Sequence, residues 1–203
     1  MASKMMPHMS RIVDDSKLDF FPTPPFATRA LYEYPLKGVI KSSDVVYEPC
    51  AGIGAMADVI KEYNDKVITS DIKDYGYKLD HNKDFLTEGF DVKCDWIITN
   101  PPYNLATEFI LKSLDSADKG VAMLLRTQFI ETKGRYEKLF SNKPFSIMAQ
   151  FVERVGMKYA VVDEKAASAT PYAWFIWIKG ETQPKVMWIP PIKNELSNAA
   201  LNK

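Results

Sequence analysis

The sequence predicts an α/β fold with a mostly parallel sheet, because strand-like and helix-like segments alternate along one chain. The chain has 203 residues, of which 46% are hydrophobic, which is enough for the core of one domain. Strands that alternate with helices are joined by right-handed crossovers, and these favour a parallel sheet covered by helices on both faces. In such sheets, ligands bind beyond the carboxyl ends of the strands.

The alternation is clearest in the middle of the chain. A short apolar strand is followed by a turn of small residues and then by a segment whose apolar residues fall on one helical face. This order repeats, and two strand-like runs come last. The predicted strands are residues 44–47, 66–70, 96–99, 121–125, 145–152 and 172–178, and the predicted helices are residues 56–64, 105–117 and 131–140.

Composition excludes several classes of protein. Lys plus Arg and Asp plus Glu each number 26, so there is no net positive charge to indicate nucleic-acid binding, and any such contact must come from a local patch. Cys50 and Cys94 are the only cysteines, and neither has metal-ligand partners nearby. No apolar run reaches the ~20 residues of a membrane span. We therefore expect a cytoplasmic protein with neither a metal nor a membrane as partner.

The two ends of the chain differ from its middle. Residues 1–17 are polar and rich in methionine, and we expect a flexible N-terminal arm there. Residues 18–190 are predicted to form a single domain, and residues 191–203 a C-terminal tail.

The turn of small residues that follows the first predicted strand is the first candidate site. Gly52 and Gly54 let the backbone approach a ligand at positions where a Cβ atom would collide. With Ala57 they also satisfy the dinucleotide pattern G-x-G-x-x-A, and Asp71 follows where a ribose-binding acid belongs. A dehydrogenase is therefore one candidate function, and a tight turn without a ligand is another.

The turn from Asn100 to Tyr103 favours a different chemistry. Pro101 and Pro102 end a buried strand, because proline cannot donate to a strand ladder. An amino group conjugated with a ring is a poor nucleophile, so a catalyst that methylates it should accept hydrogen bonds from both of its N–H groups. The Asn100 side-chain oxygen and the Pro101 carbonyl can do so, while Tyr103 offers a face for stacking. Hydride transfer gives no reason for these residues.

Residues 48–54 and residues 100–103 together resemble the S-adenosylmethionine-dependent amino-methyltransferases, most closely the N6-adenine DNA methyltransferases. The resemblance covers roughly residues 20–180. It implies a Rossmann-like class I methyltransferase domain whose mostly parallel, seven-stranded sheet ends in an antiparallel hairpin. It also implies S-adenosylmethionine as cofactor, and direct in-line methyl transfer to an adenine amino group of DNA, with Asn100, Pro101, Pro102 and Tyr103 as the catalytic turn.

The resemblance further assigns a cofactor site. The segment that contains Phe21 and Thr23 matches the family segment at the methionine end of the cofactor, and it precedes the glycine turn as in one large subgroup of DNA adenine methyltransferases. Asp71 matches the acid that holds the ribose, and Asp84 with Phe85 matches the pair that recognises the cofactor adenine. The residues expected to bind the cofactor are Phe21, Thr23, Pro24, Glu48, Pro49, Ala51, Gly52, Gly54, Asp71, Ile72, Asp84, Phe85 and Asn100.

The chain departs from the family in lacking a separate target-recognition domain, a feature that fits an enzyme of a phage or mobile element. The loop 153–171 carries Arg154, Lys158 and Lys165, and it is either a DNA-facing loop or a solvated connection. The candidate contacts to the target base or its phosphates are Arg126, Gln128, Arg154 and Tyr172.

Three alternatives stay open at this point. The substrate is RNA adenine, or it is a glutamine amide of a protein, because an amide nitrogen poses the same problem of a delocalised lone pair. Known enzymes of the glutamine class carry a helical domain before the catalytic one, and only about 20 residues precede Phe21 here. The third alternative is an interaction module that binds the cofactor without catalysis, which the intact turn at Asn100 disfavours. The residues leave the oligomeric state open.

Overall fold

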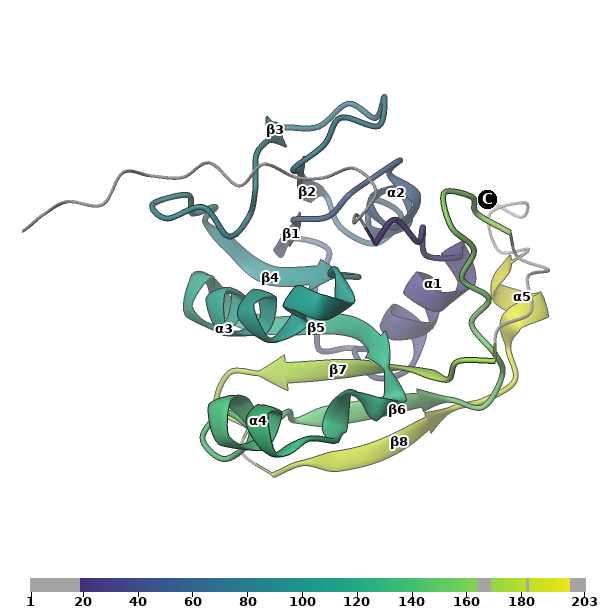
Figure 1. Ribbon diagram of the computed structural model, residues 1–203. Helices are drawn as coiled ribbons and strands as arrows, with labels where there is room; N and C mark the ends of the chain where they lie inside the picture. Colours follow the sequence, from purple (N-terminus) through teal and green to yellow (C-terminus); the bar gives the residue numbers. More distant parts are fainter. Residues whose placement is uncertain (1–18, 164–168, 182, 198–203) are drawn as a thin grey trace, which may run out of the picture.

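The structure, a computed structural model, describes residues 19–163, 169–181 and 183–197 (Figure 1). They form one sheet of eight strands in the order β3-β2-β1-β4-β5-β7-β6-β8. The strands are β1 (Val45–Glu48), β2 (Lys66–Asp71), β3 (His81–Asn82), β4 (Cys94–Thr99), β5 (Ala117–Arg126), β6 (Ile147–Phe151), β7 (Tyr172–Ile178) and β8 (Lys185–Ile189). The helices are α1 (Pro25–Glu33), α2 (Ala55–Ile60), α3 (Ala106–Ser116), α4 (Lys133–Arg135) and α5 (Lys193–Ser197), with 3-10 turns η2 (Tyr103–Leu105) and η3 (Thr127–Ile130) and a π-helical turn η4 (Tyr136–Phe140).

The sheet topology confirms the predicted Rossmann-like fold. β3, β2, β1, β4 and β5 are mutually parallel, and β7 is antiparallel to both of its neighbours, β5 and β6. The predicted antiparallel hairpin is therefore present. The predicted count of seven strands was wrong, because the sheet has eight. β3 is only two exposed residues long and β8 is mostly exposed, so neither strand leaves a clear apolar pattern in the sequence.

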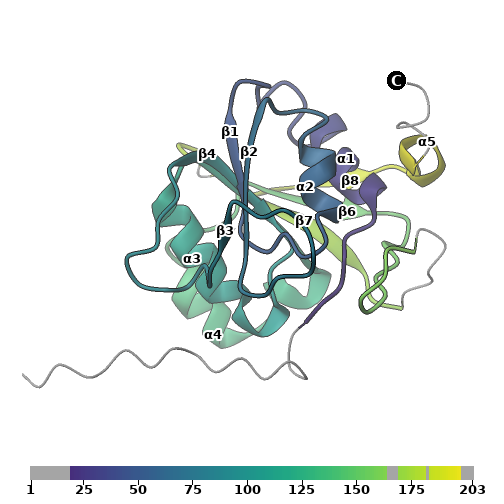
Figure 2. The ribbon, with the colours of Figure 1, turned by 90° about the horizontal axis from the view of Figure 1, so that it is seen from above.

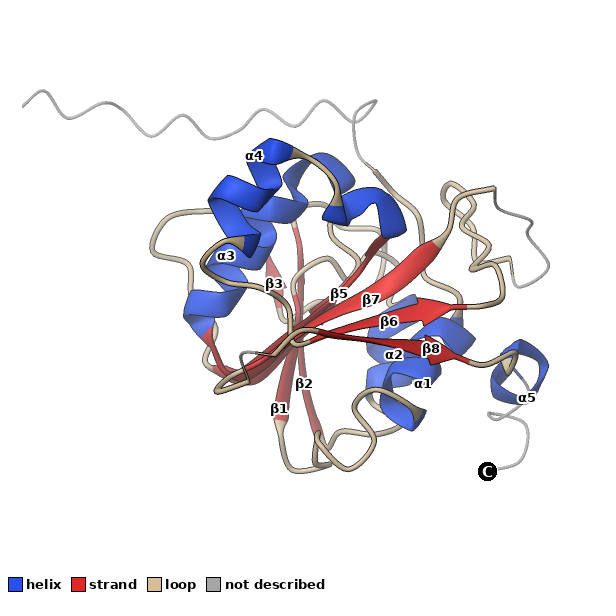
Figure 3. Cartoon of the chain, turned by 90° about the horizontal axis from the view of Figure 1, so that it is seen from below, coloured by secondary structure: helices blue, strands red, loops and turns tan. Residues whose placement is uncertain are grey.

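Helices cover both faces of the sheet, as predicted. In Figure 3, α1, α2 and α5 lie on one side of the strands and α3 and α4 on the other. Alternate residues of the central strands point to opposite faces, so Trp96 and Ile98 of β4 pack toward α1 while Ile97 packs toward α3. The resulting double-faced core holds the carboxyl ends of β1, β2 and β4 at one edge of the sheet.

Several element boundaries differ from the predicted ones for local reasons. α1, which was not among the predicted helices, begins at Pro25, a favourable first helical residue. β5 begins at Ala117 and not at residue 121 as predicted. Lys119 forms ion pairs with the buried Asp44 and with Asp95, and these pairs hold the polar start of β5 in the sheet. The predicted helix 131–140 is a short α-helix followed by a π-helical turn, since Thr132, with φ of 118°, delays the helix start.

The predicted arm, residues 1–17, lies outside the described residues. Within the predicted tail 191–203, residues 193–197 form α5, and the Leu196 carbonyl accepts a hydrogen bond from the buried Arg29 of α1 at 2.6 Å. In the part of the chain that the structure describes, none of the helices has both the length and the apolar character needed to cross a bilayer.

Candidate active site

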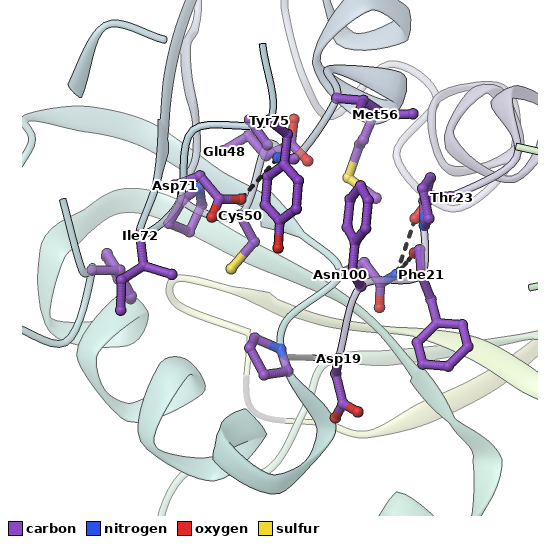
Figure 4. Close-up of a pocket in the computed structure, with 18 of the residues that line it drawn as sticks. Asp19, Phe21, Thr23, Glu48, Cys50, Met56, Asp71, Ile72, Tyr75 and Asn100 are labelled. Carbon is purple, nitrogen blue, oxygen red and sulfur yellow. Dashed lines mark hydrogen bonds between the residues drawn. The ribbon is translucent and has the colours of Figure 1, made fainter. Parts of the chain in front are cut away.

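A cavity of about 300 Å³ lies at the carboxyl edge of the sheet (Figure 4). Glu48 ends β1, Asp71 ends β2 and Asn100 follows β4 directly, and all three line the cavity. A fourth wall comes from the segment 19–23, which precedes α1. In Figure 2 this segment runs alongside the loop that follows β6, and the Ala160 N–H donates to the Phe20 carbonyl at 2.9 Å. The cavity is thus built from parts of the chain that are far apart in sequence.

The turn between β1 and α2 requires its two glycines. Gly52 has φ of 54° and Gly54 has φ of 82°, values that residues with a Cβ atom rarely adopt. A Cβ atom on Gly52 would lie 2.9 Å from the Phe20 ring, and one on Gly54 would overlap the Tyr77 ring. The glycines therefore let the backbone pass close to two aromatic rings, of which Phe20 lines the cavity and Tyr77 does not.

Asp71 connects the end of β2 to this glycine turn. Its Oδ2 accepts a hydrogen bond from the Gly52 N–H at 2.8 Å, and its Oδ1 accepts one from the Lys73 N–H at 3.1 Å. Burial raises the pKa of Asp71 above its ordinary value, and the backbone N–H donors only partly offset this effect. The carboxylate therefore braces the turn and also presents acceptor oxygens to the cavity.

Glu48 is an unusual residue for a cavity wall, because only 2% of it is exposed. Its Oε2 is buried and has no hydrogen-bond partner among the described residues. Burial, followed by the nearby Asp71 charge, raises the pKa of Glu48 well above its usual range. Burial likewise raises the pKa of the neighbouring Cys50, so this thiol is not a ready nucleophile.

Asn100 is held in one orientation by the segment that precedes α1. Its Nδ2 donates to the Phe21 carbonyl at 3.0 Å and to the Thr23 hydroxyl oxygen at 3.2 Å (Figure 4). Because a carbonyl can only accept, the amide nitrogen must face Phe21, and the amide oxygen must face away. That oxygen, Oδ1, is buried and has no partner among the described residues. The site therefore offers a fixed acceptor to a hydrogen-bond donor.

Tyr103 lies beside the cavity and does not line it. Its N–H donates to Asp19 Oδ2 at 3.1 Å, and its hydroxyl lies 3.1 Å from that of Tyr172. The guanidinium carbon of Arg126 is 4.3 Å from the centre of the Tyr103 ring. The structure thus brings together two of the predicted target-side residues, while Gln128 and Arg154 are exposed and make no described contact with Tyr103.

Most of the predicted cofactor residues gather around the cavity. Pro24 and Gly54 do not line it: Pro24 precedes α1 and Gly54 precedes α2. Residues that sequence reasoning missed also contribute, and several lie beside or within a recognised segment. Asp19 and Phe20 precede Phe21, Met56 lies within the glycine pattern, and Asn104 follows Tyr103. The predicted residues that line the cavity are Phe21, Thr23, Glu48, Pro49, Ala51, Gly52, Asp71, Ile72, Asp84, Phe85 and Asn100, and those missed include Asp19, Phe20, Met56, Tyr75, Asn104, Leu105 and Phe109.

Asp84 and Phe85 line the cavity from the loop that follows β3. The Oδ1 atom of Asp84 accepts the Leu86 N–H at 2.9 Å, and Phe85 is buried between Tyr47 and Phe109. Among the described residues there is no group of three or more His, Cys, Asp or Glu side chains able to hold a metal ion.

Comparison with known proteins gives one curated relative and many similar structures. No protein-family model matches the sequence. The chain is 25% identical over 140 residues to the ribosomal RNA small subunit methyltransferase A of Metamycoplasma arthritidis, an alignment that covers 62% of this chain and 53% of the relative. The chain thus spans about half the length of the curated relative that it matches.

Several of the similar solved structures are named as methyltransferases. One is a type I restriction-modification methyltransferase subunit of Streptococcus thermophilus (TM-score 0.64, 13% identity, 86% of this chain and 48% of that chain). Another is named "putative RNA methyltransferase PH1948" of Pyrococcus horikoshii (TM-score 0.62, 16% identity, 82% of this chain and 90% of that chain). A third, with bound S-adenosylmethionine, is the magnesium protoporphyrin IX methyltransferase of Synechocystis PCC 6803 (TM-score 0.50, 13% identity, 77% of this chain and 79% of that chain). The chain therefore has the Rossmann-like fold of S-adenosylmethionine-dependent methyltransferases.

Proposed function

We propose that this protein is an S-adenosylmethionine-dependent methyltransferase that modifies the N6 amino group of adenine in DNA. The observation that carries the proposal is the orientation of Asn100. Its buried Oδ1 has no donor within the described part of the chain, and the proposed catalytic turn lies beside a cavity of the kind that this fold uses for its cofactor.

The residues around the cavity fit S-adenosylmethionine. The cofactor carries an ammonium group and ribose hydroxyls, all of them donors, and the cavity presents acceptors at Glu48 and Asp71. The glycine turn brings backbone to the cavity wall, because Pro49, Ala51 and Gly52 all line it. When bound, the cofactor supplies an electrophilic methyl group. In this proposal Asp71 holds the ribose, Asp84 and Phe85 hold the adenine ring, and Phe21 and Thr23 lie at the methionine end.

The target amine is held by the catalytic turn. Asn100 Oδ1 and the Pro101 carbonyl accept from its two N–H groups, which favours a pyramidal nitrogen with an available lone pair. Pro101 and Pro102 fix the Pro101 carbonyl before the substrate arrives, and the hydrogen bonds from Asn100 Nδ2 to Phe21 and Thr23 fix Oδ1. Tyr103 stacks on the base. No covalent intermediate is needed, in agreement with the raised pKa of the Cys50 thiol.

Adenine in RNA is the second candidate substrate. The curated relative acts on ribosomal RNA by its name, and a similar structure is named as an RNA methyltransferase. DNA is favoured by the order of the sequence motifs, in which the cofactor-contacting segment precedes the glycine turn, and by the restriction-modification structure. Both substrates require the same presentation of an unstacked adenine.

The test is transfer of labelled methyl from S-adenosylmethionine to duplex DNA, single-stranded DNA, RNA and a protein lysate in parallel. We expect label on N6-methyladenine of DNA. Asn100→Ala should lower turnover by about 100-fold or more with little loss of cofactor binding, because it removes a preorganised dipole. Label on RNA alone would select the second candidate, and equal turnover by Asn100→Ala and the unaltered protein would contradict the mechanism.

A further inference from the structure

One face of the Tyr103 ring is covered by Arg126. The guanidinium carbon lies 4.3 Å from the ring centre, which is a stacking distance. Elsewhere, Tyr103 packs against the core cluster on the α1 side of the sheet, and its ring centre is 6.2 Å from those of Phe21 and Tyr172. The face that a target base would need is therefore the face that Arg126 occupies.

The sheet register places Arg126 at this position. Arg126 is the last residue of β5 and lies directly opposite Tyr172 of β7 in the antiparallel ladder. Side chains opposite each other in such a ladder share one face, so Arg126 and Tyr172 both reach Tyr103, one over its ring and the other at its hydroxyl. Backbone pairing thus fixes the base of the Arg126 side chain while its tip stays exposed.

No other residue of the described chain holds the Arg126 guanidinium in this position. Within residues 19–163, 169–181 and 183–197, its guanidinium makes neither an ion pair nor a hydrogen bond. A contact of this kind at an exposed site is weak, and an incoming base can displace it at little cost. The displaced guanidinium would carry five N–H donors in a planar fork that suits a phosphate.

We propose that Arg126 is a gate for the target base. It occupies the base-stacking face of Tyr103 in the free protein, and when a base enters it swings to a phosphate of the same nucleic-acid strand. This inference rests on the proposed function and deepens it, because it gives Arg126 two roles. Arg126 covers the stacking face of Tyr103 in the free protein, and it contacts the nucleic-acid strand in the complex. Arg126 therefore opposes the binding of a bare base and favours the binding of a strand.

The test compares two ligands that differ in phosphate content. Adenosine, which has no phosphate, is titrated by ligand-observed NMR. Mixed-sequence single-stranded DNA and RNA oligonucleotides are titrated by fluorescence anisotropy at several salt concentrations. S-adenosylhomocysteine is present throughout. The variants are Arg126→Ala, Arg126→Lys and, as the control, Lys185→Ala, which removes an exposed cation at the start of β8 on the opposite edge of the sheet.

For Arg126→Ala we expect opposite changes with the two ligands. Adenosine affinity should rise about two- to fivefold, because the weak competing contact with Tyr103 is lost. Oligonucleotide affinity should fall, and the slope of log affinity against log salt should decrease by about one phosphate contact. Arg126→Lys should retain most of the oligonucleotide affinity, because it keeps the charge. Lys185→Ala should leave the affinities for adenosine and for the oligonucleotides unchanged.

Other outcomes overturn the gate. Unchanged or lower adenosine affinity in Arg126→Ala would show that Arg126 does not occupy the base site, and an unchanged salt slope would show that it does not reach a phosphate. Failure of the unaltered protein to bind either ligand would also reject it. Failure of the proposed function gives a different result, namely no methyl transfer to nucleic acid while the opposite binding changes persist.

Discussion

Asn100 shows how a single residue acquires its role from distant parts of the chain. The two groups that orient its amide come from residues 77 and 79 positions earlier. Its place after a buried strand and before two prolines could be predicted from the sequence. The direction of its oxygen could not be predicted, because that depends on where the Phe21 carbonyl and the Thr23 hydroxyl come to lie. Tyr75 was missed for a similar reason, since it belongs to no recognisable motif. Met56 occupies an unspecified position of the pattern G-x-G-x-x-A, so that pattern gave no reason to select it.

Asp71 should contribute to cofactor affinity. Asp71→Ala is expected to weaken S-adenosylhomocysteine binding by about 1–3 kcal/mol, because it removes a buried acceptor from the cavity and leaves the Gly52 N–H without its partner. Calorimetric titration measures the loss. Asp74→Ala is a suitable control, because it removes an exposed acid from the loop that follows β2. Equal affinity in Asp71→Ala and the unaltered protein would remove Asp71 from the site.

Glu48 should make stability depend on pH. A carboxyl whose pKa is raised by folding stabilises the folded state fully below its unfolded pKa, and this contribution is lost as pH rises through the folded pKa. A tenfold difference in proton affinity between the two states corresponds to about 1.4 kcal/mol. Glu48→Gln cannot titrate, so this loss of stability is absent in the variant. The melting temperature of Glu48→Gln minus that of the unaltered protein should therefore increase from pH 5 to pH 8. A constant difference across that range, measured by thermal unfolding, would contradict the raised pKa.

Elements could be predicted from the sequence where a run of apolar residues marks a buried strand. β4 and β7 are buried along nearly their whole length, and their apolar runs set their positions to within a residue or two. β8 could not be predicted, because Val186 and Trp188 face outward at the edge of the sheet and Trp188 is 65% exposed. Its place is set by pairing with β6, a tertiary contact that leaves no pattern in its own residues.

Gly120 should be required where β5 pairs with β4, directly opposite Trp96. A Cβ atom there would overlap the Trp96 ring and lie 2.7 Å from the Trp177 carbonyl oxygen. Gly120→Ala should therefore lower the free energy of unfolding by about 1–3 kcal/mol through overpacking. Denaturant unfolding measures the change. Gly134→Ala is the matched control, because it has open space and an exposed helical position and should be neutral or slightly stabilising. Equal stability of the two variants would argue against tight packing at Gly120.

At the scale of the whole molecule, cofactor binding should stabilise the fold. S-adenosylhomocysteine at 100 times its dissociation constant adds about 2.7 kcal/mol if it binds only the folded chain. For a domain of this size that corresponds to a rise in melting temperature of roughly 5–10 °C. Differential scanning fluorimetry over a ligand series checks this. A melting temperature that stays constant at millimolar ligand would contradict the assignment of the cavity.

The segment 19–23 contributes to the candidate site and not to the regular secondary structure. It belongs to no strand or helix, yet it supplies both groups that orient Asn100 as well as the Asp19 carboxylate that holds the Tyr103 N–H. A chain that began at Pro25 would lose both groups that orient the Asn100 amide. In evolutionary terms, we expect substitutions in these five residues to change the proposed activity more than the fold, so the activity can diverge while the sheet is kept.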